Sequence, residues 1–424
     1  MDILYPNCAG IDVHKKFITV CRLHQDADGR MHKEIRTFGT MPSDIRDLCI
    51  WLAAVGCTHV IMESTGVYWM PLYNVLEEQF TVWLVNAQHL KRVPGRKTDV
   101  KDADWLAQIL QRGLITPSFM PPREQRMLRD LVRYRQTLIE ERTRVSNRIE
   151  KVLEEANLKL AAVVSRIQGV TAQAILHAIV EGEIDPQRLA DLAQGSLRRK
   201  REDLVRALDG QMRPHHRFLL GRLLGHLEFL DAEITAVEQE TTQVLEALPA
   251  YRAAIEQLDT IPNVSTQTAT LIVAEIGIDM SRFPSDKHLA AWAGLAPGNN
   301  ESGGKVRPSK ARKGNTHLQR GLVQVARSLA RGKENYLRAL YYRLCARRGP
   351  NRACVAVART ILQIAYYLLK RGETYHDLGA DYFDRQHKER TARRLLKRLE
   401  GLGYDVTKVM APQCQVETVY GATG

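Results

Sequence analysis

The sequence predicts an α/β domain at the N-terminus, followed by a longer and mostly helical remainder. Two patterns lead to this prediction. Up to about residue 115, short apolar segments rich in β-branched residues alternate with segments of helical spacing. From about residue 122 onward, apolar residues recur every three or four positions over long stretches, which is typical of helices. At 424 residues the chain is long enough for two or three domains.

Three strands are expected first, within a domain of residues 1–118. Cys8 to Val13 is short and mostly apolar, and Phe17 to Leu23 contains the β-branched run Ile18-Thr19-Val20. A turn at Asp26 to Gly29 leads to a third strand around Lys33 to Phe38. Because short turns connect these strands, antiparallel pairing is expected.

Helices and strands alternate in the rest of this domain. The expected elements are, in order, a helix that Ser43 or Asp44 can cap, a buried strand from Thr58 to Met62 that ends in Glu63, a helix from near Val67, a strand from Thr81 to Val85, and a helix from Lys101 to Leu110.

Four carboxylates occur at the ends of these elements. Asp12 ends the first strand, Glu63 ends the fourth, and Asp99 and Asp102 are one helical turn apart where the last helix begins. Clustered carboxylates raise one another's pKa unless a cation lies among them, and hard oxygen ligands suit Mg²⁺. Two such ions would form a phosphoryl-transfer site. Taken singly, each acid is more often a turn former or a helix cap, and Asp104 is expected to be solvated.

The order of these elements is that of an RNase H-like domain. Three strands and a helix precede a strand that ends in Glu, and Asp-x-x-Asp then opens a helix. Because the order and the acids agree, the combination is more specific than any acid alone.

Residues 119–255 are expected to form long helices with one coiled-coil seam. The seam residues alternate in steps of three and four with one polar exception, Thr241. They are Leu220, Leu223, Leu227, Leu230, Ile234, Val237, Thr241, Val244 and Leu248. The pattern leaves open whether this helix packs in a two-helix hairpin within one chain or pairs two protomers.

Residues 256–345 are expected to form a helical unit with a glycine-rich interruption from Gly294 to Gly304. In it, Ser302 lies between Glu301 and two glycines, where a phosphate can approach closely. A serine hydroxyl needs a metal or a base to become a nucleophile, and alternatively Ser302 is an ordinary loop serine. From Ser302 to Lys333 there is no acid, and nine basic residues are candidates for binding phosphates: Lys305, Arg307, Lys310, Arg312, Lys313, Arg320, Arg327, Arg331 and Lys333.

Residues 258–265 resemble a helix-hairpin-helix turn, which holds a DNA phosphate on backbone N–H groups. Asn263 and Ser265 stand where this turn usually has glycines. Asn tolerates a positive φ but Ser does so poorly, so a purely structural hairpin is equally consistent. The remaining stretch, 346–424, contains an apolar helix from Val355 to Leu369 and a basic run from Arg385 to Arg398, interpreted as a solvated helix face.

Composition favours nucleic acid as the partner. Lys and Arg number 61 against 48 Asp and Glu, a net charge of +13, and aromatic residues are only 6%, which disfavours base stacking as the main mode of binding. No apolar stretch reaches the ~20 residues of a membrane span, because the best candidate contains Arg359 and Gln363. We therefore expect no membrane partner. The seven cysteines form no CxxC pair, which indicates reduced thiols in a cytoplasmic protein.

Together these motifs resemble the IS110 insertion-sequence family of bridge-RNA-guided recombinases, over almost the whole chain. Gly10 to Lys15, Met62 to Gly66 and Lys97 to Ala103 resemble the family's Asp-Glu-Asp-Asp domain, a resolvase-type RNase H fold. The segments that resemble its serine-containing transposase domain are Ile261-Pro262, Ala291 to Pro297, Ser302 to Lys305, and Lys313 to Leu318.

The resemblance implies a role for each candidate residue. Asp12, Glu63, Asp99 and Asp102 would bind Mg²⁺, and Ser302 would attack a DNA phosphate to form a covalent 5′-phosphoserine link. The acids and the serine would meet in one composite site of a homo-oligomer, a dimer or a dimer of dimers. A structured guide RNA would pair with the element ends and the target DNA. The alternatives are a metal-dependent junction-resolving nuclease, in which water attacks, and a non-catalytic nucleic-acid-binding protein.

Overall fold

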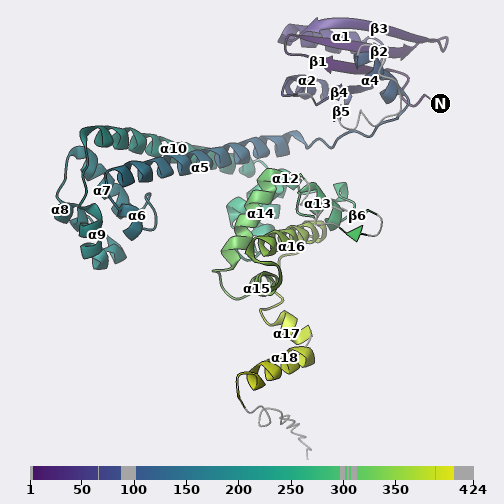
Figure 1. Cartoon of the computed structure of the whole chain (residues 1–424). Coiled ribbons are helices and arrows are strands. Elements are labelled where there is room, and N and C mark those ends of the chain that lie inside the picture. The colour runs from purple at the N-terminus through teal and green to yellow at the C-terminus, as the bar shows by residue number, and fades with distance from the viewer. Residues whose placement is uncertain are drawn as a thin grey trace, which may run out of the picture. The chain divides into compact units, whose positions relative to one another are not determined.

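The computed structural model describes residues 3–64, 66–86, 102–296, 301–302, 305–306, 313–386 and 388–404 (Figure 1). The chain divides into two compact units, Met1–Pro122 and Arg123–Gly424. The first unit contains a five-stranded sheet, and the second is built almost entirely from helices, so the prediction of an α/β domain followed by a helical remainder is confirmed.

The sheet of the first unit is mixed, with the strand order β3-β2-β1-β4-β5. β1 (Cys8–Val13), β2 (Phe17–Gln25) and β3 (Met31–Gly39) are antiparallel neighbours. β4 (His59–Glu63) pairs parallel with β1, and β5 (Thr81–Val85) pairs parallel with β4. Strand β2 is longer than predicted, because its pairing with β3 continues to the end of the hairpin.

Helices cover both faces of this sheet. α1 (Pro42–Ala53) and α2 (Trp69–Leu76) bury one face, and α4 (Asp102–Gln111) covers the other. Successive strand residues point to opposite faces, so the apolar residues of β1 and β4 divide between two cores. Ile11 and Met62 lie in the core beneath α1 and α2, whereas Cys8 and Ile61 lie in the core beneath α4.

The start of α1 differs from the predicted cap. The helix begins at Pro42, so Ser43 and Asp44 lie inside its first turn and Met41 is the N-cap residue. Proline suits this first position because its φ is fixed and its missing N–H has no helical partner there. Asp44 instead accepts a hydrogen bond from the Met41 N–H at 3.1 Å.

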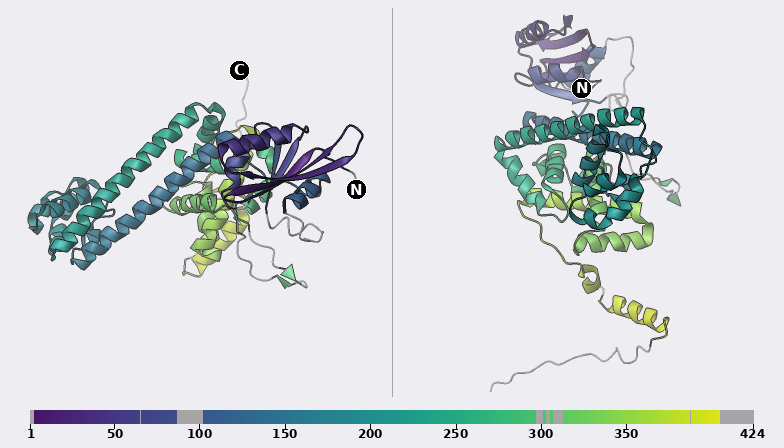
Figure 2. Two further views of the ribbon diagram at one scale, coloured as in Figure 1. Left: turned by 90° about the horizontal axis from the view of Figure 1, so that it is seen from above. Right: turned by 90° about the vertical axis from the view of Figure 1, so that its left-hand side faces the viewer.

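The second unit begins with two helices of 33 residues each, α5 (Arg123–Glu155) and α10 (Pro214–Glu246). They lie side by side (Figure 2), and the ion pairs Arg135–Glu238 and Arg142–Asp231 show that they run antiparallel. The predicted seam is buried largely against α5 of the same chain, although Leu224 is buried where Leu223 was expected. Within the chain, the seam therefore forms the two-helix hairpin.

A lobe of short helices connects the far ends of α5 and α10. It comprises α6 (Leu160–Val163), α7 (Val170–Glu181), α8 (Pro186–Asp191) and α9 (Arg201–Leu208), with a 3₁₀ turn at Gly195–Lys200. Its apolar residues share one core with the α5–α10 hairpin.

Six further helices surround a second core of this unit. They are α11 (Pro249–Asp259), α12 (Thr266–Ile276), α13 (Asp286–Trp292), α14 (Thr316–Leu329), α15 (Tyr336–Arg348) and α16 (Pro350–Arg371). The predicted boundary between residues 345 and 346 lies inside α15, and both α15 and α16 contribute to this core.

Helix α16 is the central helix of this second core. In the part of the chain that the structure describes, it is also the one helix long and apolar enough to cross a membrane by length and composition. Half of its apolar stretch is buried inside the unit, and Val357, Ile361 and Leu362 are fully buried. Its hydropathy is therefore that of a core helix. Two short helices, α17 (Tyr382–Gln386) and α18 (Lys388–Glu400), follow it.

Candidate functional site

Two of the predicted carboxylates lie side by side at one edge of the sheet. The parallel register of β1 and β4 pairs Ile11 with Met62, and Asp12 and Glu63 are the next residues on the two strands. Both side chains are partly buried. Because the strands are parallel, their carboxyl ends meet at the same edge of the sheet.

Both carboxylates belong to the face of the sheet that α4 covers. A Cβ atom on Gly10 would lie only 2.2 Å from the Ala103 carbonyl oxygen, so Gly10 faces α4 at close range. Asp12 is two residues further along β1 and therefore shares this face. Ile61 belongs to the core beneath α4, and the same alternation assigns Glu63 to that face.

The start of α4 lies at the same edge. The Cys8 thiol donates a hydrogen bond to the Ala107 carbonyl at 3.7 Å, and Ala107 is one turn further along α4 than Ala103. Helix α4 therefore runs antiparallel to β1, and its first residue, Asp102, lies toward the carboxyl end of that strand. The fold thus brings three of the four predicted acids to one edge, whereas Asp99 lies outside the described residues.

The carboxylate of Asp12 has a neighbour, His14, that is not among the predicted site residues. His14 Nε2 lies 3.0 Å from Asp12 Oδ2, and both side chains are partly exposed. The His14 ring also packs against Phe17, with the ring centroids 4.5 Å apart. Because the ring holds one oxygen of Asp12, the orientation of this carboxylate is restrained.

Asp104 was predicted to be solvated, and this prediction is wrong. Its side chain is 4% exposed and accepts hydrogen bonds from Lys33 at 2.7 Å and from Gln108 at 3.0 Å, with the Cys21 thiol at 3.6 Å. Burial alone would raise the pKa of Asp104, but the bonds from Lys33 and Gln108 outweigh burial and lower this pKa below its ordinary value. Asp104 therefore joins α4 to β2 and β3 as a carboxylate.

The chemistry of these acids fits a divalent cation. Asp12, Glu63 and Asp102 present carboxylate oxygens, which are the ligands that Mg²⁺ takes in proteins. Among the described residues, no three His, Cys, Asp or Glu side chains are close enough to hold a metal by themselves. Asp99, three residues before Asp102, is the remaining predicted ligand.

Ser302 lies in a short hairpin on a loop whose two ends meet. β6 (Glu301–Ser302) and β7 (Lys305–Val306) pair antiparallel, with Ser302 opposite Lys305. A Cβ atom on Gly314 would lie 2.2 Å from the Gly294 nitrogen, so the backbone at residue 314 packs directly on that at residue 294. Gln319 also donates to the Gly294 carbonyl at 3.1 Å. The serine loop, which carries Ser302, therefore leaves the helical unit at Gly294 and returns to it at Gly314, and we refer to this place as the anchor point.

A buried glutamate supports this anchor point. Glu275 is 1% exposed and receives two hydrogen bonds from the Arg133 guanidinium, at 2.7 and 2.8 Å. Asn315, which caps α14 directly after Gly314, donates to the same carboxylate at 2.6 Å. Burial would raise the pKa of Glu275, but the bonds from Arg133 and Asn315 outweigh it and lower this pKa. Glu275 is not among the predicted site residues, although it is the single acid within the apolar sequence of α12.

Six of the nine predicted phosphate-binding residues lie between Lys305 and Arg320. Lys313 is exposed beside the anchor point, whereas Arg320 pairs with Glu140 of α5 at 3.1 Å and is partly neutralised. Lys305 lies in β7. The remaining three residues of the predicted set within the serine loop, Arg307, Lys310 and Arg312, lie outside the described residues.

The hairpin-like segment needs a positive φ at one of its two unusual positions. Asn263 has φ 63°, whereas Ser265 has φ −81° and caps α12 by accepting a hydrogen bond from the Thr268 N–H at 3.4 Å. Asn263 also donates to the Ser328 hydroxyl at 3.2 Å. The turn therefore does not need glycine, because Asn tolerates the one positive φ. The Asn263 side chain also joins the turn to α14.

Comparison with known families identifies transposases at both ends of the chain. A model of the DEDD transposase domain of IS110 elements matches residues 9–158, and a model described as the transposase of the IS116/IS110/IS902 family matches residues 255–342. Together they cover more than half of the chain. The chain therefore belongs to the IS110 family of insertion-sequence transposases, as the motifs predicted.

Individual relatives agree with this assignment. The transposase for insertion sequence element IS1111A of Coxiella burnetii is 29% identical over 328 residues, which are 76% of this chain and 79% of the relative. The transposase for element IS1328 of Yersinia enterocolitica is 26% identical over 334 residues, covering 74% of this chain and 85% of the relative. A pilin gene-inverting protein of Moraxella bovis is 26% identical over 145 residues, covering 34% of this chain and 45% of the relative.

Proposed function

We propose that this chain is a site-specific DNA recombinase that moves its own insertion sequence, with Ser302 as the nucleophile. The observation that carries the proposal is the shared edge of Asp12, Glu63 and Asp102 beneath the start of α4. The strand order 3-2-1-4-5, with three antiparallel strands followed by two parallel ones, is that of an RNase H-like domain and supports this assignment.

The reaction balances as two phosphoryl transfers. The Ser302 hydroxyl attacks a backbone phosphorus, a phosphoserine ester forms with the 5′ side, and the bond to the 3′ oxygen breaks, which releases a 3′-hydroxyl. A 3′-hydroxyl from the exchanged strand then attacks the phosphoserine, which rejoins DNA and restores the serine. Because the ester retains the energy of the broken bond, no external energy source is needed.

Asp12, Glu63, Asp99 and Asp102 would hold Mg²⁺, which stabilises negative charge on the phosphate and on the leaving oxygen. His14 would keep Asp12 oriented toward the shared edge, since it contacts only one of the two carboxylate oxygens in the described contacts. The serine loop, joined at Gly294 and Gly314, would bring Ser302 to the DNA as a unit.

A structured guide RNA from the element would select the DNA by base pairing. Sparse aromatic residues and a net charge of +13 support recognition of nucleic-acid backbone and shape rather than stacked bases. The name of the Moraxella relative, a gene-inverting protein, agrees with a DNA rearrangement rather than simple cutting.

A denaturing gel tests the serine step. The full chain is incubated with Mg²⁺, the element-derived RNA and labelled junction DNA. A slow band that survives SDS and disappears on protease treatment is expected for the unaltered chain and for Ser309→Ala, a matched control within the same loop. Ser302→Ala and Asp12→Asn should abolish it. Cut DNA without this band, retained in Ser302→Ala and lost in Asp12→Asn, would establish a water-attacking nuclease instead.

A further inference from the structure

A long part of the second unit is almost free of acidic residues. From Asn315 to Arg371 there are twelve Lys or Arg and a single acid, Glu334. Like charges at this density repel one another in the folded protein, so they destabilise it unless an anion neutralises them. The important question is which of these cations the protein itself neutralises.

Several of them have partners within the chain. Arg320 pairs with Glu140, Arg338 with Glu334, and Arg371 with Glu373. Two more lie over aromatic rings, since the Arg343 guanidinium is 5.1 Å from the Phe383 centroid and the Lys370 ammonium is 5.5 Å from the Tyr366 centroid. These contacts do not need a ligand.

Of the remaining seven, Arg359 is partly buried in α16, and the other six are exposed and form no ion pair in the described chain. They cluster at two neighbouring places, the end of α14 and the junction of α15 with α16. They are Arg327, Arg331, Lys333, Arg347, Arg348 and Arg352.

A cavity joins these two places. It has a volume of about 510 Å³ and is lined on one side by Arg327, Ser328 and Arg331 at the end of α14. Pro350 and Asn351 of α16 line the other side. We refer to it as the α14–α16 pocket. It contains two guanidinium groups and no acidic side chain among its lining residues, so it is suited to an anion.

The α14–α16 pocket adjoins the hairpin-like turn. Ser328, which lines the pocket, accepts the hydrogen bond from Asn263 of the turn. A Cβ atom on Gly332 would lie 2.9 Å from the Asn263 side chain, so the turn also packs closely on the end of α14. The turn therefore fixes the position of the segment that carries Arg327 and Arg331.

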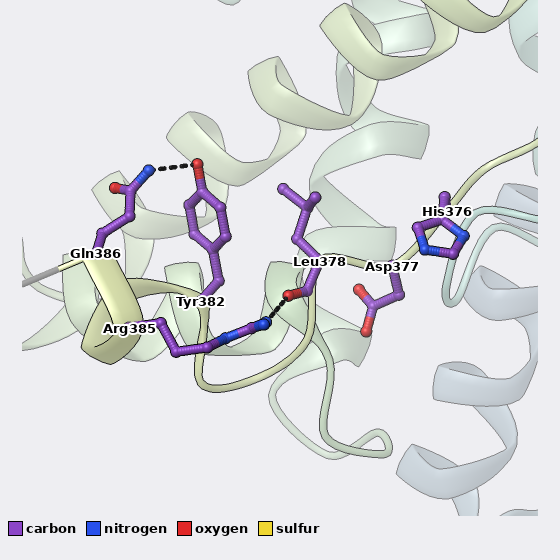
Figure 3. Close-up of a pocket in the computed structure, with 6 residues that line it drawn as sticks. All are labelled: His376, Asp377, Leu378, Tyr382, Arg385 and Gln386. Atoms are coloured by element: carbon purple, nitrogen blue, oxygen red, sulfur yellow. Dashed lines mark hydrogen bonds between the residues drawn. The ribbon is translucent and has the colours of Figure 1, made fainter. Parts of the chain in front are cut away.

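A second pocket of similar volume shows what an internally neutralised site looks like (Figure 3). It is lined by residues of segment 376–386, with Arg385 as its cation. Arg385 donates to the Leu378 carbonyl at 2.6 Å and pairs with Asp381 at 3.0 Å. Asp377 contributes a carboxylate to the lining, so this pocket offers no uncompensated positive charge.

We propose that the α14–α16 pocket binds a backbone phosphate of nucleic acid, with Arg327 and Arg331 as its contacts. A free phosphate ion would engage only the pocket itself. The unpaired cations continue beyond it through Lys333, Arg347, Arg348 and Arg352, and a polymer of phosphates can contact all of them. This inference rests on the nucleic-acid-binding part of the proposed function and not on the serine chemistry.

The test compares two double variants of the full chain with equal loss of charge. Arg327→Gln with Arg331→Gln removes the pocket cations, whereas Arg320→Gln with Arg338→Gln removes two arginines that already have carboxylate partners. Binding of a duplex DNA and of a folded RNA is measured by fluorescence anisotropy over a series of NaCl concentrations. All four arginines lie at the surface or are partly exposed, so thermal unfolding should show that both variants fold.

The pocket variant should reduce the slope of log affinity against log salt by about 1, since the one phosphate that both arginines contact contributes roughly 0.9. The control variant should change it by less than about half as much. A reduced slope with DNA, with RNA or with both supports the pocket and identifies which backbone occupies it. An unchanged slope with both probes, or an equal change in the two variants, overturns the proposal. It is also overturned if the pocket binds inorganic phosphate but neither nucleic acid.

These outcomes are independent of cleavage. If no protein–DNA adduct forms in the unaltered chain but the pocket variant reduces the slope, the serine chemistry fails and the pocket stands. If the adduct forms and the slopes are unchanged, the reverse holds.

Discussion

Replacing Gly10 by alanine should displace α4 from the sheet and disrupt the carboxylate edge. The added Cβ would lie 2.2 Å from the Ala103 carbonyl oxygen and 2.3 Å from the Ala107 nitrogen. Ordinary contacts of a Cβ begin near 3.4 Å, so the helix must move by roughly 1 Å. Both neighbours are backbone atoms of a helix, which cannot rotate away as a side chain can. Overpacking of this kind costs about 1–3 kcal/mol of unfolding free energy.

The same shift should reduce activity. Asp102 is the first residue of α4, so it would move relative to Asp12 and Glu63 by a similar distance. A misplacement of about 1 Å can cost roughly 10²-fold in rate, so adduct formation should fall by that order.

Urea unfolding followed by tryptophan fluorescence measures the stability effect. Four of the five tryptophans lie in the first unit, so the signal follows mainly this unit. Gly225→Ala is the matched control, because a Cβ there meets nothing within 4 Å and the residue lies within α10. Because Gly225 lies in the second unit, that change should leave the unfolding transition of the first unit unaltered. Unchanged stability and activity in Gly10→Ala would refute the close packing of α4 on β1.

Three further predictions concern stability. Glu275→Ala should destabilise the second unit by about 3 kcal/mol, because it leaves two arginines of α5 without their buried carboxylate; a loss below ~1 kcal/mol in thermal unfolding would contradict this. The pKa of Asp104 is lowered in the folded protein, so this carboxylate stabilises the fold above its ordinary pKa of 3.8, and the stabilisation is lost as pH falls through the folded pKa. Asp104→Asn removes the ion pair with Lys33 and should therefore make stability less dependent on pH below about pH 4. An unchanged dependence of stability on acid pH would argue against this. Leu227→Ala should cost about 2–5 kcal/mol and Leu223→Ala clearly less, since Leu227 is 1% exposed and Leu223 is only partly buried; equal losses would place the seam differently.

The elements of the first unit follow from sequence because their signals are local. β-branched runs and turn residues predicted all five strands, and the strand-end positions of Asp12 and Glu63 follow from the same local patterns. Asp104 was misassigned for the opposite reason. Its burial depends on Lys33 and Cys21, which approach it only after β2 and β3 have paired and α4 has packed on them.

In the second unit too, the helices follow from local sequence patterns, whereas their packing partners do not. Helical periodicity predicted α10 and its seam, but the partner of the seam depends on tertiary packing, which single-chain periodicity does not specify. Arg327 and Arg331 were among the nine predicted phosphate-binding residues, but the pocket that distinguishes them from the others depends on tertiary packing, as does the burial of Glu275. The acid in the apolar helix is neutralised by Arg133 of α5, which is far from it in the sequence. The exposed arginines line a pocket only because Asn351 of α16 packs opposite them.

Peptide mapping of the covalent adduct tests the proposed recombinase most directly. The complex formed with Mg²⁺, guide RNA and junction DNA is denatured, digested with nuclease and protease, and analysed by mass spectrometry. We predict that the peptide containing Ser302 carries a nucleotide attached through its 5′ phosphate, and that EDTA added before the DNA prevents this. Cleaved DNA with an unmodified Ser302 peptide, or a nucleotide on another residue, would contradict the account.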